Sequence, residues 1–328
     1  MPEGHTALVT GGAGFIGSHL VERLLNDGWA VRVIDDCSTG RLQNLSAVLQ
    51  HPRLSVETCR ISDWNHLEDW IKESTIIFHL AAAVGVELVV RSPIHTIETN
   101  LQETARILEM AGRHTTPVLL ASTSEVYGKS KKHQFEESDD LLIGPPHLGR
   151  WSYACSKLMD EFMAMAYARE QRLPVVITRL FNTVGPRQTG KYGMVLPRFI
   201  KAALSGNPLK VYGDGGQRRC FCYVDDIVES LIRLADCAPA RGQVVNIGGQ
   251  EEIRIKDLAR RVIDLTHSSS TIETVEYATA YAPGFEDMLR RYPVTDKLHR
   301  LTGFRPATSL REIILRTAQW QENSPPEK

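Results

Sequence analysis

The stretch Ala7–Gly17, which reads ALVTGGAGFIG, decides the fold of this chain. Its first four residues are apolar or β-favouring and predict a buried strand, and the residues from Ile16 to Leu25 predict an amphipathic helix. Between them the glycines follow the spacing G-x-x-G-x-x-G. Glycine permits a tight turn and lets a pyrophosphate approach the backbone, and the helix N-terminus offers free N–H groups. A strand before the glycines and a helix after them predict a dinucleotide-binding turn.

The second predicted strand ends at Asp35, 18 residues after Gly17. A carboxylate at this position can accept hydrogen bonds from both ribose hydroxyls and would repel a 2′-phosphate, which favours NAD over NADP. Arg41 offers a competing attraction for a phosphate, and Asp35 could also be an ordinary turn residue. Because the glycine turn precedes it, we interpret Asp35 as a ribose ligand.

Outward from this turn, short apolar runs alternate with helical stretches through the first half of the chain. This alternation predicts a Rossmann-like α/β fold, a doubly wound parallel sheet. After Phe181 glycine, proline and mixed charge become frequent, which predicts a smaller mixed α/β substrate domain. We expect an NAD-binding domain at 1–180 and a substrate domain at 181–328, with parts of 211–250 returning to the first. The predicted strands are Ala7–Thr10, Ala30–Asp35, Leu54–Cys59, Ile76–Leu80, Val118–Ser122 and Pro174–Arg179.

The composition is that of an ordinary globular protein of 328 residues, 42% hydrophobic, with a net charge of -1. Such a balance gives no general attraction to nucleic acid or to anionic membranes. The N-terminus lacks the hydrophobic region of a signal peptide, and no apolar run is long enough to span a membrane, so we expect a cytoplasmic protein. Cys220 and Cys222 lack a second Cys or His pair, so we expect free thiols and no metal site.

Tyr153 and Lys157 are four residues apart, so on a helix they share one face. A neighbouring ammonium can lower the pKa of the phenol, which would let Tyr153 move a proton near neutral pH. The same spacing also occurs on solvated helix faces. The glycine turn upstream favours the catalytic interpretation.

Taken together, these motifs resemble the extended short-chain dehydrogenase/reductase family, the NAD-dependent nucleotide-sugar epimerases and dehydratases. The resemblance covers nearly the whole chain, and the motifs occur in the family's order. They are Thr10–Gly17 (TGGAGFIG), His79–Ala82 (HLAA), Asn100, Ser122–Gly128 (STSEVYG), Tyr153 with Lys157, Arg179–Arg187 (RLFNTVGPR), Gly216–Phe221 (GQRRCF) and Arg290-Arg291.

The resemblance implies a role for each matching position. Tyr153 would take a proton from a sugar hydroxyl, Lys157 would hold the nicotinamide ribose, and Thr123 would hydrogen-bond the same hydroxyl. With Glu125 these form the predicted catalytic set. The predicted cofactor residues are Gly11, Gly14, Phe15, Ile16, Gly17, Asp35, Asp36, Ser38, Thr39, Gly40, Ile61, Leu80, Ala81, Ala82, Asn100, Tyr153 and Lys157. The predicted ligands of a UDP-sugar are Ser124, Glu125, Asn182, Arg187, Val195, Tyr212, Arg219 and Arg291.

The stretch Thr123-Ser124-Glu125 bears on the reaction. The family's 4,6-dehydratases usually carry an acid where Ser124 stands, and its simple 4-epimerases usually carry a small or apolar residue where Glu125 stands. The chain looks most like UDP-glucuronate decarboxylase, which makes UDP-xylose through a 4-keto intermediate and recycles its NAD. A nucleotide-sugar 4-epimerase acting on UDP-glucuronate or UDP-glucose is the alternative, and Glu125 could also merely balance Arg150 or Lys129.

One position departs from the family, in which an Asp usually reads the adenine amine. Here Arg60 stands at that position and cannot accept the hydrogen bond, while Ile61 can still pack on the adenine. From the family we also expect a homodimer formed through helices that include Leu101–Arg113 and Tyr153–Arg169. A non-catalytic NAD-binding sensor is the alternative outside enzymes, although such proteins commonly lose the Tyr or the Lys.

Overall fold

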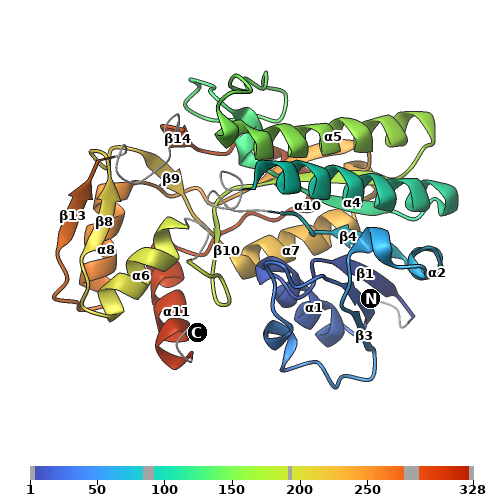
Figure 1. Cartoon of the computed structure of the whole chain (residues 1–328), viewed down its shortest axis with the longest axis horizontal. Coiled ribbons are helices and arrows are strands. Elements are labelled where there is room, and N and C mark those ends of the chain that lie inside the picture. The colour runs from blue at the N-terminus through green and yellow to red at the C-terminus, as the bar shows by residue number, and fades with distance from the viewer. Residues whose placement is uncertain (1–3, 84–91, 191–193, 277–287, 325–328) are drawn as a thin grey trace.

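The computed structural model describes residues 4–83, 92–190, 194–276 and 288–324, and its centre is a seven-stranded parallel sheet (Figure 1). The strand order is β11-β6-β5-β4-β1-β2-β3, which is a doubly wound arrangement. All six strands predicted from the sequence are present, and the α/β fold class is confirmed. The strands are β1 (Thr6–Thr10), β2 (Ala30–Ile34), β3 (Leu54–Glu57), β4 (Ile76–His79), β5 (Val118–Thr123), β6 (Val175–Leu180) and β11 (Gln243–Ile247).

Helices cover both faces of the sheet, which is why its central strands are apolar along their length. Residues of β1 alternate between the faces: Ala7 and Val9 join one core, and Leu8 joins the other. The first core is closed by α1 (Phe15–Asn26), α7 (Val224–Ala235) and α10 (Asp296–Thr302). The second is closed by α2 (Leu67–Lys72), α4 (Pro93–His114) and α5 (Ser152–Glu170).

A smaller mixed α/β part stands beside the sheet and has its own apolar core (Figure 1). Three helices enclose this core, and short strands form its outer layers. The helices are α6 (Val195–Leu204), α8 (Ile255–Leu265) and α11 (Leu310–Asn323). The strand groups are β8 (Leu209–Tyr212) with β13 (Ile272–Val275), and β9 (Arg218–Cys220) between β12 (Glu252–Arg254) and β14 (Arg290–Arg291).

The chain passes between the two parts more than once. It leaves the sheet after β6, and β7 (Thr183–Val184) pairs with β10 (Cys222–Tyr223) at the junction. It then returns through α7 to β11, which pairs in parallel with β6 from Gln243 to Ile247. The large sheet therefore combines six strands from the first 180 residues with β11, which follows much later in the sequence. Within the residues that the structure describes, no helix has the length and apolarity needed to cross a membrane.

Candidate active site

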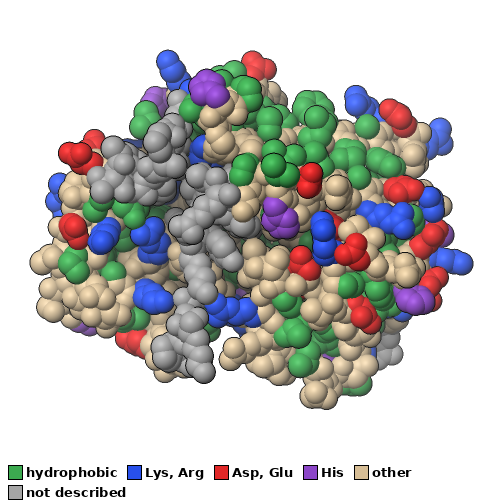
Figure 2. All heavy atoms as spheres, viewed as in Figure 1, with side chains coloured by type: hydrophobic (Ala, Val, Ile, Leu, Met, Phe, Trp, Pro, Cys, Tyr) green, Lys and Arg blue, Asp and Glu red, His purple; other side chains and the backbone are tan. Residues whose placement is uncertain are grey.

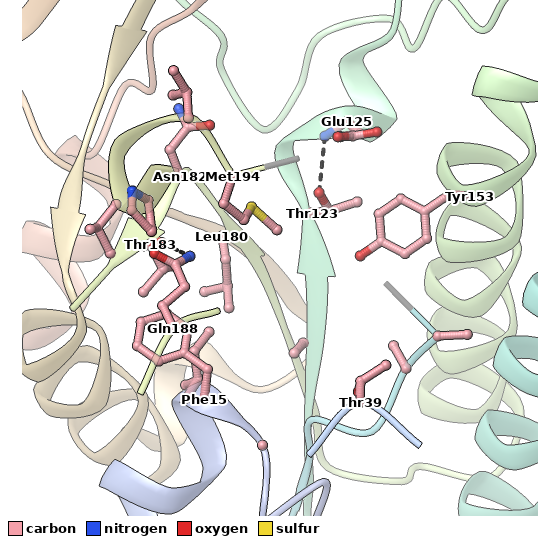
Figure 3. Close-up of a pocket in the computed structure, with 18 of the residues that line it drawn as sticks. Phe15, Thr39, Thr123, Glu125, Tyr153, Leu180, Asn182, Thr183, Gln188 and Met194 are labelled. Carbon is pink, nitrogen blue, oxygen red and sulfur yellow. Dashed lines mark hydrogen bonds between the residues drawn. The ribbon is translucent and has the colours of Figure 1, made fainter. Parts of the chain in front are cut away.

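A cavity of about 730 Å³ lies at the carboxyl ends of the sheet strands, and both parts of the molecule line it (Figure 3). The glycine turn and the ends of β4 and β5 form one wall, together with the first turn of α5. The opposite wall comes from the segment after β6, from α6 and from β8, β9 and β14. Ligands of open α/β sheets bind at this edge.

The glycine turn has the geometry that a dinucleotide requires. Gly11 has a φ of +70°, and a Cβ there would lie 2.8 Å from the backbone nitrogen of Ala81. A Cβ on Gly17 would lie 2.1 Å from the carbonyl oxygen of Gly11. Helix α1 begins directly after Gly14, which gives its first turn no side-chain cap. The N–H groups of that turn therefore remain available to a pyrophosphate.

Asp35 lies on the same wall, only 8% exposed. Its two carboxylate oxygens each accept one backbone hydrogen bond at 2.8 Å, from the nitrogens of Ala13 and Cys37. Burial raises the pKa of Asp35, and these two hydrogen bonds oppose the rise. Each oxygen keeps further acceptor capacity for a ribose hydroxyl. The other predicted cofactor residues that line the cavity are Phe15, Ile16, Asp36, Ser38, Thr39, Ile61, Leu80, Ala81 and Ala82.

Three predicted ligands lie outside the cavity lining. Gly40 packs behind the glycine turn, where a Cβ would lie 2.9 Å from the carbonyl carbon of Ala13. The side chain of Asn100 accepts a hydrogen bond from Ala83 N at 2.8 Å and donates to Ser156 Oγ at 3.0 Å. Gly40 and Asn100 therefore support the site from behind.

Arg187 is the third such residue. Its Nη2 donates to both carboxylate oxygens of Glu22 on α1, at 2.7 and 2.8 Å. This pair joins the segment after β6 to α1. In this structure the guanidinium is used in that contact and does not reach the cavity, so its binding role stays a prediction.

Tyr153 projects from the first turn of α5 into the cavity, beside Thr123 at the end of β5 (Figure 3). Burial raises the pKa of Tyr153, the Glu125 carboxylate raises it further, and a hydrogen bond with Thr123 opposes the rise. The sequence predicts that Lys157 lowers this pKa, and that effect stays a prediction. The Lys157 ammonium donates to Asp160 Oδ2 at 2.8 Å.

Glu125 lies in the 3₁₀ turn Ser124–Tyr127, where its backbone nitrogen donates to Thr123 Oγ1 at 3.2 Å. Its carboxylate pairs with Arg150 through one oxygen and with Arg291 Nη1 at 3.3 Å through the other. Burial alone would raise the pKa of Glu125, but the arginines outweigh it and lower that pKa to about 2. Glu125 is therefore a carboxylate at neutral pH, and the pairing with Arg150 that the sequence left open is present.

Five of the remaining predicted substrate ligands line the opposite wall, where Figure 3 shows Asn182 across from Tyr153. Asn182 has a φ of +27° and donates from Nδ2 to the carbonyl oxygen of Cys220 at 2.8 Å. The others on this wall are Val195 at the start of α6, Tyr212 at the end of β8, Arg219 on β9 and Arg291 on β14. Ser124, which is 2% exposed, follows β5 on the wall of Tyr153. The structure thus brings seven of the eight predicted substrate residues to one cavity.

Glu103 on α4 is a cavity residue that the sequence analysis missed. It accepts hydrogen bonds from the nitrogen and hydroxyl of Ser62 at 2.8 and 2.9 Å, and Arg60 Nη2 lies 3.4 Å away. The side chain is 6% exposed, so its charge is held beside Arg60. A carboxylate therefore stands next to the position where the family's usual Asp is replaced. The unusual residue Arg60 was the signal for a nearby carboxylate. Its partner, Glu103, lies 43 positions further along the chain, so the sequence did not show which residue it was.

Comparison with known proteins supports this geometry. The NAD dependent epimerase/dehydratase family matches residues 7–248. The chain belongs to this family. The predicted resemblance and the NAD cofactor are thereby confirmed, and the protein is an enzyme of this family. Among the residues that the structure describes, no group of three His, Cys, Asp or Glu side chains has an arrangement suited to a metal ion.

Relatives within the family are similar over almost the entire chain. UDP-N-acetyl-alpha-D-glucosaminuronate decarboxylase from Bacillus cytotoxicus is 41% identical over 95% of this chain and 96% of its own length. UDP-glucuronic acid decarboxylase 3 from Arabidopsis thaliana is 36% identical over 93% of this chain and 85% of its own. The solved structure of UDP-glucuronic acid 4-epimerase from Bacillus cereus, with UDP-glucuronic acid and NAD, has a TM-score of 0.86 at 28% identity and covers 97% of this chain and 99% of its own.

Proposed function

We propose that the protein catalyses the oxidative decarboxylation of a UDP-hexuronate, with UDP-glucuronate giving UDP-xylose. The observation that carries this proposal is the charge at the reacting end of the cavity. Of the arginines that line the cavity, Arg150, Arg219 and Arg291 act on the single carboxylate Glu125 at this end. The excess of positive charge suits a substrate that carries both a diphosphate and a sugar carboxylate. The two decarboxylases described above are similar over nearly the whole chain and support the same choice.

The side chains have complementary roles in this reaction. Bound NAD would supply the acceptor for a hydride from C4 of the sugar and the donor for its return. Tyr153 takes the proton of the C4 hydroxyl, and Thr123 orients that hydroxyl. The product of this step is a β-keto acid, whose C5–C6 bond breaks to release carbon dioxide and leave an enolate. Protonation at C5 then gives the 4-keto pentose, and Tyr153 gives its proton back when C4 is reduced.

Ser124 argues against the dehydratase alternative. A 4,6-dehydration needs an acid to protonate the leaving C6 hydroxyl, and Ser124 is a neutral, fully buried hydroxyl at the matching position. Glu125, beside it, is ionised and paired with two arginines, so it has no proton to donate to a leaving hydroxyl. These residues are better suited to an acidic sugar that loses carbon dioxide.

A uronate with a 2-acetamido group is the second candidate substrate, because the 41% identical relative is named for one. Incubating the NAD-loaded protein with UDP-glucuronate and with UDP-N-acetylglucosaminuronate, and following product mass, separates the candidates. We expect a product lighter by one carbon dioxide from at least one of them, and none from UDP-glucose. A product of unchanged mass from UDP-glucuronate would favour the 4-epimerase, and the absence of any conversion would remove the proposed function.

We further propose that the protein is a homodimer formed through α4 and α5. These helices pack together on one face of the sheet, and four large apolar side chains remain exposed on them. Figure 2 shows hydrophobic side chains gathered over this part of the molecule. The side chains are Ile94 (72% exposed), Ile97 (37%), Met159 (54%) and Phe162 (61%). A second copy covering the same helices would remove this apolar surface from water.

A further inference from the structure

A continuous chain of polar side chains runs from the strand before the glycine turn to Lys157. Its members are Thr10 on β1, His79 on β4, Thr104 on α4, and Asp160 and Lys157 on α5, and none is more than 2% exposed. Polar groups this deeply buried are costly unless they are hydrogen-bonded. Apart from Lys157, these residues have no part in the reaction as described above.

The hydrogen bonds of this chain have a defined direction. The backbone N–H of Ala81 donates to Thr10 Oγ1 at 3.2 Å, so the hydroxyl proton of Thr10 is left for His79 Nδ1, 2.7 Å away. Burial lowers the pKa of His79 to about 3, and a neutral imidazole that accepts at Nδ1 carries its proton on Nε2. That nitrogen lies 3.0 Å from Thr104 Oγ1 and donates to it.

The chain continues from Thr104 to Asp160. Having accepted from His79, the Thr104 hydroxyl directs its own proton to the Asp160 carboxylate. Burial raises the pKa of Asp160, whereas the Lys157 charge and the hydrogen bond from Thr104 lower it. Asp160 Oδ2 receives Lys157 Nζ at 2.8 Å. Thr104 and Lys157 thus both act on the Asp160 carboxylate.

The titratable groups around this pair come from β4, from α5 and from the two 3₁₀ turns of the cavity wall. His79, from β4, is neutral, and Asp160 lies one turn after Lys157 on α5, where Glu161 raises the pKa of Asp160. On the cavity side, Glu125 and Asp160 raise the pKa of Tyr153, and Arg150 lowers it. Asp160 is the carboxylate in contact with the Lys157 ammonium, and a buried ammonium that loses its counter-ion moves or loses its charge.

We propose that Asp160 is a positioning residue, oriented by the chain Thr10–His79–Thr104, which fixes the Lys157 ammonium next to Tyr153. The chain starts at the Ala81 N–H, on the cavity wall that faces the cofactor. It therefore joins the cofactor side of the site to the proton-transferring side through buried groups. The inference rests on the proposed function only in requiring that Tyr153 takes the proton of a C4 hydroxyl.

The test compares three variants that change few atoms. Asp160→Asn removes the charge, and Thr104→Val removes the hydroxyl that orients it. Thr178→Val is the matched control, because Thr178 is also fully buried and its hydroxyl donates to the carbonyl of Leu120 at 3.3 Å, away from this chain of side chains. The readouts are the pH dependence of nicotinamide reduction on mixing with UDP-glucuronate, and the amount of NAD that stays bound through gel filtration. Nicotinamide reduction needs oxidation at C4 alone, so it can be read even if no carbon dioxide is released.

In Asp160→Asn we expect the rising limb of the pH profile to move to higher pH by about one unit or more, because Tyr153 loses a neighbouring cation. Thr104→Val should move it less in the same direction, and Thr178→Val should not move it. An unmoved limb in Asp160→Asn, with reduced NAD retention alone, would give Asp160 a structural role and overturn the proposal. A limb moved to lower pH would overturn it too, since Asp160 would then act only as a negative charge on Tyr153. If Asp160→Asn does not fold, an unmoved limb of the pH profile in Thr104→Val overturns the proposal that these side chains orient Asp160.

Discussion

Arg150 and Glu125 form an ion pair at the wall of the cavity where Tyr153 lies, with their side chains only 3% and 12% exposed. They come from two separate 3₁₀ turns, Gly149–Trp151 and Ser124–Tyr127, so the pair fixes these turns relative to each other. Arg291 contacts the second oxygen of the same carboxylate from the smaller part of the molecule. One carboxylate thus links the end of β5, the start of α5 and strand β14.

Replacing Glu125 by glutamine should reduce turnover by at least about 100-fold while bound NAD is retained. The substitution preserves the shape of the side chain but removes the negative charge that balances two arginines near the reacting atoms. Glu252→Gln is the matched control, because Glu252 also pairs with two arginines and is 12% exposed, yet lies outside the cavity lining. Single-turnover kinetics and NAD content measure both variants, and equal losses in the two would remove Glu125 from the mechanism.

His79 should make the folded protein sensitive to mild acid. Its pKa is about 3 when folded, against an ordinary value of 6.5, so the unfolded chain takes up a proton that the folded one does not. This contribution to stability is present above pH 6.5 and is lost as pH falls toward 3, by at most about 1.4 kcal/mol per pH unit. Urea unfolding at pH 7 and pH 4.5 should show a smaller difference for His79→Gln than for the wild type. The exposed His147→Gln should behave like the wild type, and equal differences in all three would contradict the prediction.

Glu103 should contribute to NAD affinity, because it lines the cavity and holds both Arg60 and the backbone nitrogen of Ser62. We expect Glu103→Gln to raise the dissociation constant of NAD by about tenfold, since a charged hydrogen-bond acceptor is lost. Glu109→Gln is the control on the same helix, where the carboxylate pairs with Arg106 and Arg113 at the surface. Calorimetric titration of NAD into the cofactor-free protein gives both constants. Equal dissociation constants for the two variants would contradict a role for the Glu103 carboxylate in NAD binding.

Phe162→Glu should convert the proposed dimer to a monomer, because a charge would be placed in the apolar surface of α4 and α5. Leu315→Glu on α11 provides the control, as another exposed apolar position on a different helix. Sedimentation equilibrium gives the mass of each variant. A wild type that is already monomeric, or a Phe162→Glu variant that stays dimeric, would contradict the interface.

The sequence predicted those features that depend on local patterns. The six strands and the glycine turn follow from apolar periodicity and glycine spacing within short windows, and the structure has all of them. The assignment of Tyr153, Thr123 and Glu125 to one site came from the order of motifs in a family.

Contacts between distant segments were not predictable in this way. Glu103 on α4 meets Ser62, and Thr104 on the same helix meets His79 of β4. No periodicity in the sequence records such pairings, because they depend on how α4 and α5 pack against the sheet. The raised pKa of Tyr153 was missed for this reason, because it depends on the burial of the phenol and on the Glu125 carboxylate.

The pairing of β11 with β6 also limits how this chain can be divided. A fragment ending near residue 180 would lack the strand that covers β6, leaving Val175–Leu180 as an unprotected sheet edge. Such an edge, apolar along most of its length, is a template for aggregation. Truncation at the apparent boundary should therefore yield insoluble material. The sugar-facing wall draws on both sides of β11 in the sequence, since Val195 and Arg219 precede this strand and Arg291 follows it. A cut on either side of β11 would therefore separate residues that face the same substrate.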